Sequence, residues 1–330
     1  MTSSRTRLLL LWLALTLCTA PVYSAKDLPR AAPEAVGLSG PRLDRLTEAM
    51  QAYVDDRRLA GAVVLVARRG RVAYLRSFGQ RDIESGSPMS DDVIFRIASQ
   101  TKAIISTGVM VLQEEGRLLI SDPVGRYLPE FARTQVAVAR DGGGYEVVDA
   151  RGRITIRQLL THTSGVSYGT GPASDRWESA GIQGWYFADR EEPVGDTIAR
   201  LAALPFDAHP GEQWIYGYSI DILGALIEAV SGQPLDEFLR TRIFDPLGME
   251  DTHFYLPFDK RDRLATVYSA TNDGLERAPN PGHMVGQGAY VDGPRTSFSG
   301  GAGLLSTATD YARFLQMMLD GGELEGTRLL

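Results

Sequence analysis

A serine and a lysine three residues apart open an apolar helical run, and this pair constrains the chain more than any other feature. Ser99 and Lys102 lie in the stretch 95–105, which begins with a short apolar segment and continues at helical spacing through Met110 and Leu112. If Ser99 begins that helix, Lys102 lies on the same face, with about 5 to 6 Å between the Cβ atoms. An amine can then take the hydroxyl proton, and free N–H groups at the helix N-terminus face developing negative charge. The alternative is a serine N-cap beside a solvated lysine.

Three further stretches follow this Ser-x-x-Lys pair along the chain. They are Leu-Leu-Thr-His-Thr-Ser-Gly at 159–165, Trp-Ile-Tyr-Gly-Tyr-Ser at 214–219 and Gly-Gly-Ala-Gly-Leu-Leu-Ser-Thr at 300–307. In this order and at these distances, the four stretches resemble those of the β-lactamase-related serine hydrolases, a superfamily with class C β-lactamases, D,D-peptidases and family VIII carboxylesterases. The resemblance covers residues 38–330 and is specific because separate segments agree.

The spacing of apolar residues predicts an α+β fold. Apolar residues recur at helical spacing over 42–54, which predicts a helix with one buried face. Residues 62–78 read as a β-hairpin that turns at 68–71. Helices that cover an antiparallel sheet are therefore expected, and the resemblance implies the same β-lactamase/transpeptidase-like architecture.

Later segments carry further signals. The strongest helix signal covers 220–230 and ends at Ser231-Gly232, a good C-terminal stop. The glycine-rich residues 271–294 are expected to form an irregular loop. Leu304 is then expected to enter the sheet of the hairpin, followed by a helix over 311–319.

The resulting domain prediction has two lobes. Residues 25–121 and 295–330 form the sheet lobe, and residues 122–294 form an inserted, mostly helical lobe with a return loop. The resemblance implies further sheet strands with a Lys-Thr-Gly-like or His-x-Gly-like third box, and no convincing copy of that box is present. We therefore expect the C-terminal part of the family's fold to be missing, with an incomplete sheet and an incomplete site.

The resemblance matches Tyr216 to the tyrosine of the family's second box. A nearby ammonium lowers the pKa of a phenol, so Tyr216 and Lys102 could share the duty of general base and acid for Ser99. Class C β-lactamases carry Tyr-x-Asn here, whereas this chain has Tyr216-Gly217-Tyr218. The missing asparagine favours an esterase. The alternative is that Tyr216 and Tyr218 are packing aromatics.

The walls of the substrate pocket are predicted to be aromatic. Such walls suit acyl or aryl esters. The candidate residues are Tyr168, Trp185, Trp214 and Tyr218.

A second nucleophile motif competes with the first. Residues 165–169 fit the Gly-x-Ser-x-Gly elbow around Ser167, but the elbow requires a strand before it and a helix after it. Residues 156–162 look helical, so Ser167 is expected to be a turn residue; as nucleophile it would need a later Asp and one of His209, His253 or His283. His162 is expected to orient a turn through ring hydrogen bonds. No histidine pair has metal-binding spacing, so we predict no metal and no cofactor.

The N-terminus predicts export. Arg5 and Arg7 precede the apolar run 8–17, and Ser24 is suitably placed for signal-peptide cleavage, which predicts a signal peptide over 1–24 and a periplasmic or secreted protein. The single cysteine, Cys18, lies within it, so the mature chain is expected to have no disulfide. The net charge of −7 gives no indication of nucleic-acid binding. No later apolar run is long enough to span a membrane.

Three functional hypotheses follow. A carboxylesterase would cleave small esters through an acyl-enzyme on Ser99, with Lys102 and Tyr216 as base and acid. A β-lactamase or D,D-peptidase would take β-lactams or amides as substrates. A catalytically silent penicillin-binding-like module stays open because the third box is absent.

Overall fold

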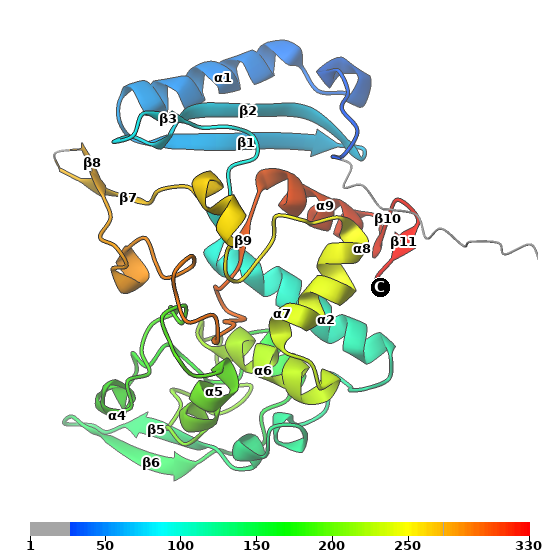
Figure 1. The fold of residues 1–330 in the computed structure, drawn as a ribbon. Helices are drawn as coiled ribbons and strands as arrows, with labels where there is room; N and C mark the ends of the chain where they lie inside the picture. The colour runs from blue at the N-terminus through cyan, green and yellow to red at the C-terminus, as the bar shows by residue number, and fades with distance from the viewer. Residues whose placement is uncertain (1–26, 273) are drawn as a thin grey trace, which may run out of the picture.

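The structure, a computed structural model, describes residues 27–272 and 274–330. The predicted signal peptide, with Cys18, lies outside the described residues. A three-stranded antiparallel sheet lies at one end of the molecule and a separate two-stranded hairpin at the opposite end, with helices between them (Figure 1). Small antiparallel sheets covered by helices confirm the predicted α+β class.

Helices cover both faces of the three-stranded sheet. Thr47 of the first helix contacts Tyr74 on one face, with 2.8 Å between the hydroxyl oxygens. Leu75 points to the other face because successive strand residues alternate, and there it lines a small cavity with Ala312 of the last helix. These elements are α1 (Gly40–Asp55), β1 (Gly61–Arg68), β2 (Arg71–Asp82), β3 (Ser87–Pro88) and α9 (Ala308–Leu319).

The centre of the molecule is a pair of buried helices, α2 (Thr101–Glu114) and α6 (Ser219–Ser231). Gly108 of α2 permits the close approach, since a Cβ there would lie 3.2 Å from Ile227 of α6. Ile227 is fully buried, and cutting such a side chain to alanine costs about 2 to 5 kcal/mol. Helix α6 ends at Gly232, whose φ of +73° is the left-handed conformation that glycine adopts readily.

The region 122–294, predicted as a mostly helical lobe, contains helices and, in addition, short strands. Its helices are joined by two hairpins that the periodicity does not reveal, β5 with β6 and β7 with β8. The elements of this region are η3 (Val124–Arg126), η4 (Pro129–Ala132), β5 (Gln135–Ala139), β6 (Tyr145–Asp149), α3 (Ile156–Leu160), α4 (Ser174–Ser179), α5 (Val194–Ala202), α7 (Leu235–Leu239), η5 (Arg240–Phe244), α8 (Asp245–Leu247), η6 (Phe258–Arg263), β7 (Tyr268–Thr271), β8 (Gly274–Arg277) and η7 (His283–Val285).

The strand after Leu304 differs from its prediction. Strand β9 (Leu305–Ser306) pairs with β4 (Phe95–Arg96), directly before the Ser99 segment, and not with the hairpin. The described chain ends in a short hairpin of β10 (Glu323–Leu324) and β11 (Thr327–Arg328). The predicted helices α1, α6 and α9 and the hairpin β1–β2 are confirmed, whereas the lobe boundaries stay a prediction. Among the described residues, no helix is both long and apolar enough to cross a membrane.

Candidate active site

Ser99 lies at the N-terminal end of α2, in a strained turn. A single 3-10 turn, Ala98–Gln100, leads into the helix, and Ala98 has a φ of +43°. This left-handed conformation costs a non-glycine residue about 1 to 2 kcal/mol. Strand pairing holds it in place, because the Ile97 N–H donates to the Leu304 carbonyl oxygen at 3.0 Å. Strain of this kind gathers at functional sites, and the Ser99 side chain here is exposed.

The Lys102 ammonium lies under Ser99 with three hydrogen-bond acceptors. Its Nζ lies 2.7 Å from the Gly301 carbonyl oxygen, 3.2 Å from Ser99 Oγ and 3.4 Å from the Tyr168 hydroxyl oxygen. Lys102 is only 9% exposed, so these acceptors replace the water that a buried ammonium loses. The predicted Ser-Lys pair is therefore in hydrogen-bond contact.

Tyr216 completes a cluster of three groups around Ser99 Oγ. Its hydroxyl oxygen lies 2.8 Å from Ser99 Oγ, and Lys102 Nζ lies 4.6 Å from its ring centroid. Burial raises the pKa of Tyr216, but the neighbouring Lys102 ammonium and Ser99 hydroxyl outweigh this effect and lower that pKa. A lowered pKa increases the fraction of phenolate near neutral pH, and the phenolate oxygen can accept a proton.

His162 supports Tyr216 by packing. The Ile215 N–H donates to the His162 carbonyl oxygen at 2.8 Å, and the two rings of His162 and Tyr216 lie 4.8 Å apart. Burial and the Lys102 charge lower the pKa of His162, which favours the neutral ring. Its Nδ1 is buried without a partner among the described residues. The predicted orienting role thus comes from its backbone and ring face, and that nitrogen makes no hydrogen bond.

Of the four predicted wall residues, two flank the cluster. Tyr168 contacts Lys102, and its ring centroid lies 5.8 Å from that of Tyr216. Trp214 stacks on Tyr216 at 6.0 Å and is 66% exposed, which leaves its outer face free for a ligand. Trp185 is half-buried, with its ring 6.2 Å from that of Tyr186. No contact between Trp185 and the Ser99 cluster is seen in the described residues.

The prediction that Tyr218 lines the pocket needs correction. Tyr218 is fully buried, and its hydroxyl donates to the Gly184 carbonyl oxygen at 2.5 Å. Its ring lies edge-on to that of Tyr168 at 4.9 Å and is stacked on Trp177 at 6.0 Å. Tyr218 therefore supports Tyr168 from behind and does not present a surface to substrate.

The competing motif at Ser167 lacks the geometry of an elbow. The element before it is helix α3, and the next helix begins only at Ser174. Ser167 is 3% exposed, and its Oγ accepts from the Gly169 N–H at 3.0 Å, as in a turn. Its predicted role as a turn residue is therefore confirmed. The candidate partner His209 uses Nδ1 to accept the Arg151 N–H at 3.2 Å.

Sequence reasoning missed two contributors, the Gly301 carbonyl and Asp221 behind it. Asp221 is fully buried in α6, and its Oδ1 accepts from the Gly301 N–H at 2.9 Å. A signal was present, because Asp221 is the single charged residue in the apolar run 220–227. The backbone at Gly300 and Gly301 passes close to α6, since a Cβ at either position would collide with that helix.

Comparison with known proteins agrees with this geometry. The family model named Beta-lactamase matches residues 46–330. The chain belongs to the β-lactamase family. Esterase EstB of Burkholderia gladioli is 36% identical over 287 residues, which cover 82% of this chain and 69% of EstB.

Two solved structures extend the comparison within the β-lactamase family. The structure of EstCE1, described as a hydrolase with promiscuous acyltransferase activity, superposes with a TM-score of 0.74 at 30% identity, covering 87% of this chain and 74% of EstCE1. Simvastatin synthase of Aspergillus terreus gives a TM-score of 0.68 at 29% identity, covering 86% of this chain and 70% of the synthase. This chain is therefore a β-lactamase-family serine hydrolase or acyltransferase with esterase relatives.

Proposed function

We propose that this chain is a carboxylesterase that works through an acyl-enzyme on Ser99. The observation that carries the proposal is the convergence of two ionisable groups on one exposed hydroxyl: Ser99 Oγ lies 2.8 Å from the Tyr216 oxygen and 3.2 Å from Lys102 Nζ. Either group, once in its deprotonated form (the Tyr216 phenolate or the neutral Lys102 amine), can take the serine proton as Oγ attacks the ester carbonyl carbon.

The remaining steps use the same groups. The tetrahedral oxyanion would face the backbone N–H of Ser99 at the start of α2. Its collapse breaks the bond to the alcohol, which leaves with the proton returned by Tyr216 or Lys102. Water then attacks the acyl-enzyme, loses its proton to the same groups and frees the acid and Ser99.

Two features support an ester over a β-lactam as the substrate. The position that carries an amide in class C β-lactamases is the buried Tyr218, whose hydroxyl is bonded to Gly184. It offers no amide to the side chain of a β-lactam. The exposed ring of Trp214 beside Tyr216 gives a flat apolar surface for an acyl or aryl group. The relative EstB is named an esterase, which also supports an ester as the substrate.

The test is a set of rate measurements on the mature protein. We expect p-nitrophenyl acetate and butyrate to be cleaved with burst kinetics, Ser99→Ala to abolish cleavage, and nitrocefin to be turned over at least about 100-fold more slowly, a difference of about 2.7 kcal/mol in activation free energy. Faster turnover of nitrocefin than of the esters would contradict the esterase proposal and favour a β-lactamase. If neither the esters nor nitrocefin are turned over or acylate Ser99, the result would favour a catalytically silent module.

A second candidate is transfer of the acyl group to an alcohol instead of water. It is supported by the description of EstCE1 as a hydrolase with promiscuous acyltransferase activity, and by the exposure of the Ser99 side chain to solvent. Adding a bulky secondary alcohol to the ester assay and separating the products would measure the share of acyl groups transferred. A share no greater than in the uncatalysed mixture would contradict transfer.

We also propose that the chain is exported. The support is the sequence alone, with Arg5 and Arg7 before an apolar run and Ser24 before Ala25. Expression in a Gram-negative host followed by intact-mass analysis of the periplasmic protein would show an N-terminus near Ala25. A full-length product confined to the cytoplasm would contradict export.

A further inference from the structure

Asp221 is a buried carboxylate for which the proposed acyl transfer has no direct use. It lies in the first turn of α6, is fully buried, and is flanked by buried apolar neighbours such as Ile220 and Ile222. Burying a charge is costly unless its partners recover the lost hydration. The partners of Asp221 therefore indicate why a carboxylate is placed there.

Both hydrogen bonds to Asp221 come from the glycine-rich segment that faces Lys102. Its Oδ1 accepts from the Ser299 hydroxyl at 2.7 Å and from the Gly301 N–H at 2.9 Å. Ser299 Oγ in turn accepts from the Ala302 N–H at 3.2 Å. The carboxylate thus holds two successive peptide groups of this segment.

One of these peptide groups connects Asp221 to the candidate site. The peptide between Gly301 and Ala302 donates its N–H to Ser299, and its carbonyl oxygen accepts from Lys102 Nζ at 2.7 Å. A continuous chain of hydrogen bonds therefore runs from Asp221 through Ser299 and this peptide to Lys102. Each bond in such a chain polarises the next.

The packing of Gly301 makes the arrangement specific. A Cβ at Gly301 would lie 2.3 Å from Asp221 Oδ2, so only glycine lets the backbone reach the carboxylate. Oδ2 itself is buried without a hydrogen-bond partner among the described residues. This oxygen packs on the Gly301 backbone.

We infer that Asp221 is a positioning residue, which through Ser299 and the Gly301–Ala302 peptide fixes the acceptor of Lys102 and places a negative charge behind the lysine. Lys102 is thereby held beside Ser99. The effect of Asp221 on turnover rests on the proposed function, whereas its effect on Lys102 rests on the contacts alone.

The other titratable groups around this pair are phenols and one imidazole. The charge of Asp221 raises the pKa values of Tyr168 and Tyr218, after the larger effect of burial, so these phenols stay protonated. Tyr216 and His162 also lie near Lys102. Burial raises the pKa of Tyr216 and lowers that of His162, and the Lys102 charge lowers both. Burial raises the pKa of Asp221, and the bonds from Ser299 and Gly301 and the charge of Lys102 act against that rise.

The direct test follows the protonation of Lys102 by NMR. The sequence contains only three lysines, Lys26, Lys102 and Lys260, so a protein labelled with ¹³Cε-lysine gives three resolvable titrations. Lys102→Arg assigns the signal. In Asp221→Asn we expect the Lys102 midpoint to move to lower pH, because loss of a nearby negative charge makes the ammonium easier to deprotonate. An unmoved midpoint would overturn the inference.

Asp310→Asn is the matched control. Asp310 is a second buried carboxylate, 7% exposed, that accepts from the Asp251 N–H and the Thr252 hydroxyl. Its substitution should leave the Lys102 midpoint in place. An equal shift in both variants would mean that any lost buried charge has this effect, and would also overturn the inference.

Turnover and stability give the second readout. We expect Asp221→Asn to lower kcat/KM for a p-nitrophenyl ester about 10- to 100-fold, by analogy with the loss of outer hydrogen-bond partners at metal sites, and to move the acid limb of the pH profile to lower pH. Its Tm should stay the same or rise, since a buried charge is removed. A lowered Tm with an unchanged acid limb would indicate a merely structural residue.

The two proposals fail differently. An inactive wild-type protein whose Lys102 midpoint still moves in Asp221→Asn would remove the esterase and keep the positioning role. An active wild-type protein whose Lys102 midpoint does not move in Asp221→Asn would keep the esterase and remove the positioning role. If Asp221→Asn does not fold, Ser299→Ala keeps the buried charge and cuts the chain to Lys102; it should lower kcat/KM several-fold, and an unchanged value would contradict the inference.

Discussion

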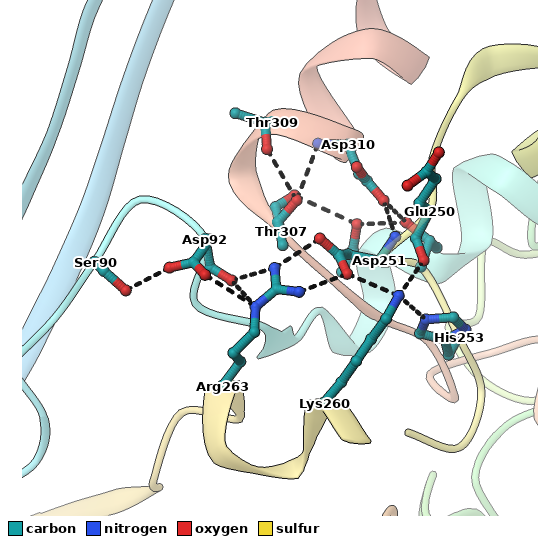
Figure 2. A network of polar contacts seen from close by, with 12 residues as sticks. Ser90, Asp92, Glu250, Asp251, His253, Lys260, Arg263, Thr307, Thr309 and Asp310 are labelled. Atoms are coloured by element: carbon teal, nitrogen blue, oxygen red, sulfur yellow. Dashed lines mark hydrogen bonds and ion pairs between the residues drawn. The ribbon is translucent and has the colours of Figure 1, made fainter. Parts of the chain in front are cut away.

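Two polar clusters in this molecule are built in the same way and differ in how completely they are paired. Each joins segments far apart in the sequence, and each places a lysine among acceptors. The first is the Ser99 cluster of Ser99, Lys102 and Tyr216. The second is the Asp251 network, in which Figure 2 labels Asp92, Asp251, His253, Lys260, Arg263 and Asp310. Thr252 and Ser306 belong to it through their hydrogen bonds.

In the Asp251 network the central charges have partners. Asp251 accepts two hydrogen bonds from Arg263, at 2.8 and 2.6 Å, and forms an ion pair with Lys260 at 2.9 Å (Figure 2). Asp310 Oδ2 accepts from the Asp251 N–H at 2.8 Å and the Thr252 hydroxyl at 2.9 Å. These bonds join η6 to the start of α9, so the network fixes the fold.

The Ser99 cluster is left incomplete by comparison. Its serine is exposed, and the preceding Ala98 is strained. Next to the cluster, Asp221 Oδ2 and His162 Nδ1 are buried without hydrogen-bond partners within the described residues. A site that must exchange protons with a substrate cannot have all its groups satisfied beforehand, whereas a structural network can. The comparison therefore predicts that changes in the first cluster affect rate and changes in the second affect stability.

The largest effect is expected from Lys102→Met. Loss of the amine should lower kcat/KM for a p-nitrophenyl ester about 1,000- to 10,000-fold, the upper range for a general base, with a Tm equal to or above that of the wild type. Lys260→Met, in the Asp251 network, is the matched control and should lower the Tm with kcat/KM unchanged. A similar loss of kcat/KM in the two variants would contradict the proposed difference between the two clusters.

Tyr216→Phe is expected to have the second-largest effect. Removing the phenol oxygen should lower kcat/KM about 100- to 1,000-fold. Because the pKa of Tyr216 is lowered, the wild-type rate should rise with pH and level off below the ordinary tyrosine value of about 10. The variant should lose this step in its pH profile. Tyr218→Phe removes a buried hydroxyl instead; it should keep the step and lower stability by about 1 kcal/mol.

Asp251→Ala should produce the opposite pattern. Arg263 and Lys260 would keep their partly buried positive charges without a carboxylate, which should lower the free energy of unfolding by about 2 to 4 kcal/mol. Chemical denaturation measures this loss, and kcat/KM of the folded fraction should stay within about 2-fold of wild type. A large loss of rate at full folding would place the network in the catalytic machinery.

The smallest effect concerns the pH dependence of stability. Burial and the Lys260 charge lower the pKa of His253 to about 4, so the stability that its neutral ring contributes is lost as pH falls from 6.5 toward 4. Burial raises the pKa of Asp310 to about 6, so its contribution is present at low pH and lost as pH rises through 6. Between pH 7 and pH 5 we expect a loss of about 2 kcal/mol from His253 and a gain of about 1 kcal/mol from Asp310.

Single variants separate these opposing effects. Asp310→Asn should make stability fall more steeply between pH 7 and pH 5 than in the wild type, and His253→Gln should make it rise slightly. Urea denaturation at several pH values measures both. The same slope in all three proteins would contradict the assigned pKa shifts.

The sequence predicts those parts of the molecule whose structure depends on local pattern. Periodicity is sufficient for α1, α6, α9 and the hairpin β1–β2, because each has one apolar face or a clear turn. Periodicity does not predict the hairpin β5–β6, because its strands are short and alternate only weakly between buried and exposed residues.

At the site, the motifs correctly predict that Ser99, Lys102 and Tyr216 meet. They do not predict the direction of each side chain. Tyr218 lies two residues after Tyr216 and yet points into the core, because the turn before α6 sends the two rings to different sides. The partners of Asp221 are about 80 residues further along the chain, and only the path of the backbone through Gly301 brings them together.

The most direct test of the account is intact-mass labelling with a fluorophosphonate, which reacts with activated serines. It compares wild type, Ser99→Ala and Ser167→Ala, so that both candidate motifs are judged in one experiment. We expect one adduct on the wild type and on Ser167→Ala, and none on Ser99→Ala. An adduct that persists in Ser99→Ala and disappears in Ser167→Ala would contradict the account and assign the nucleophile to the turn.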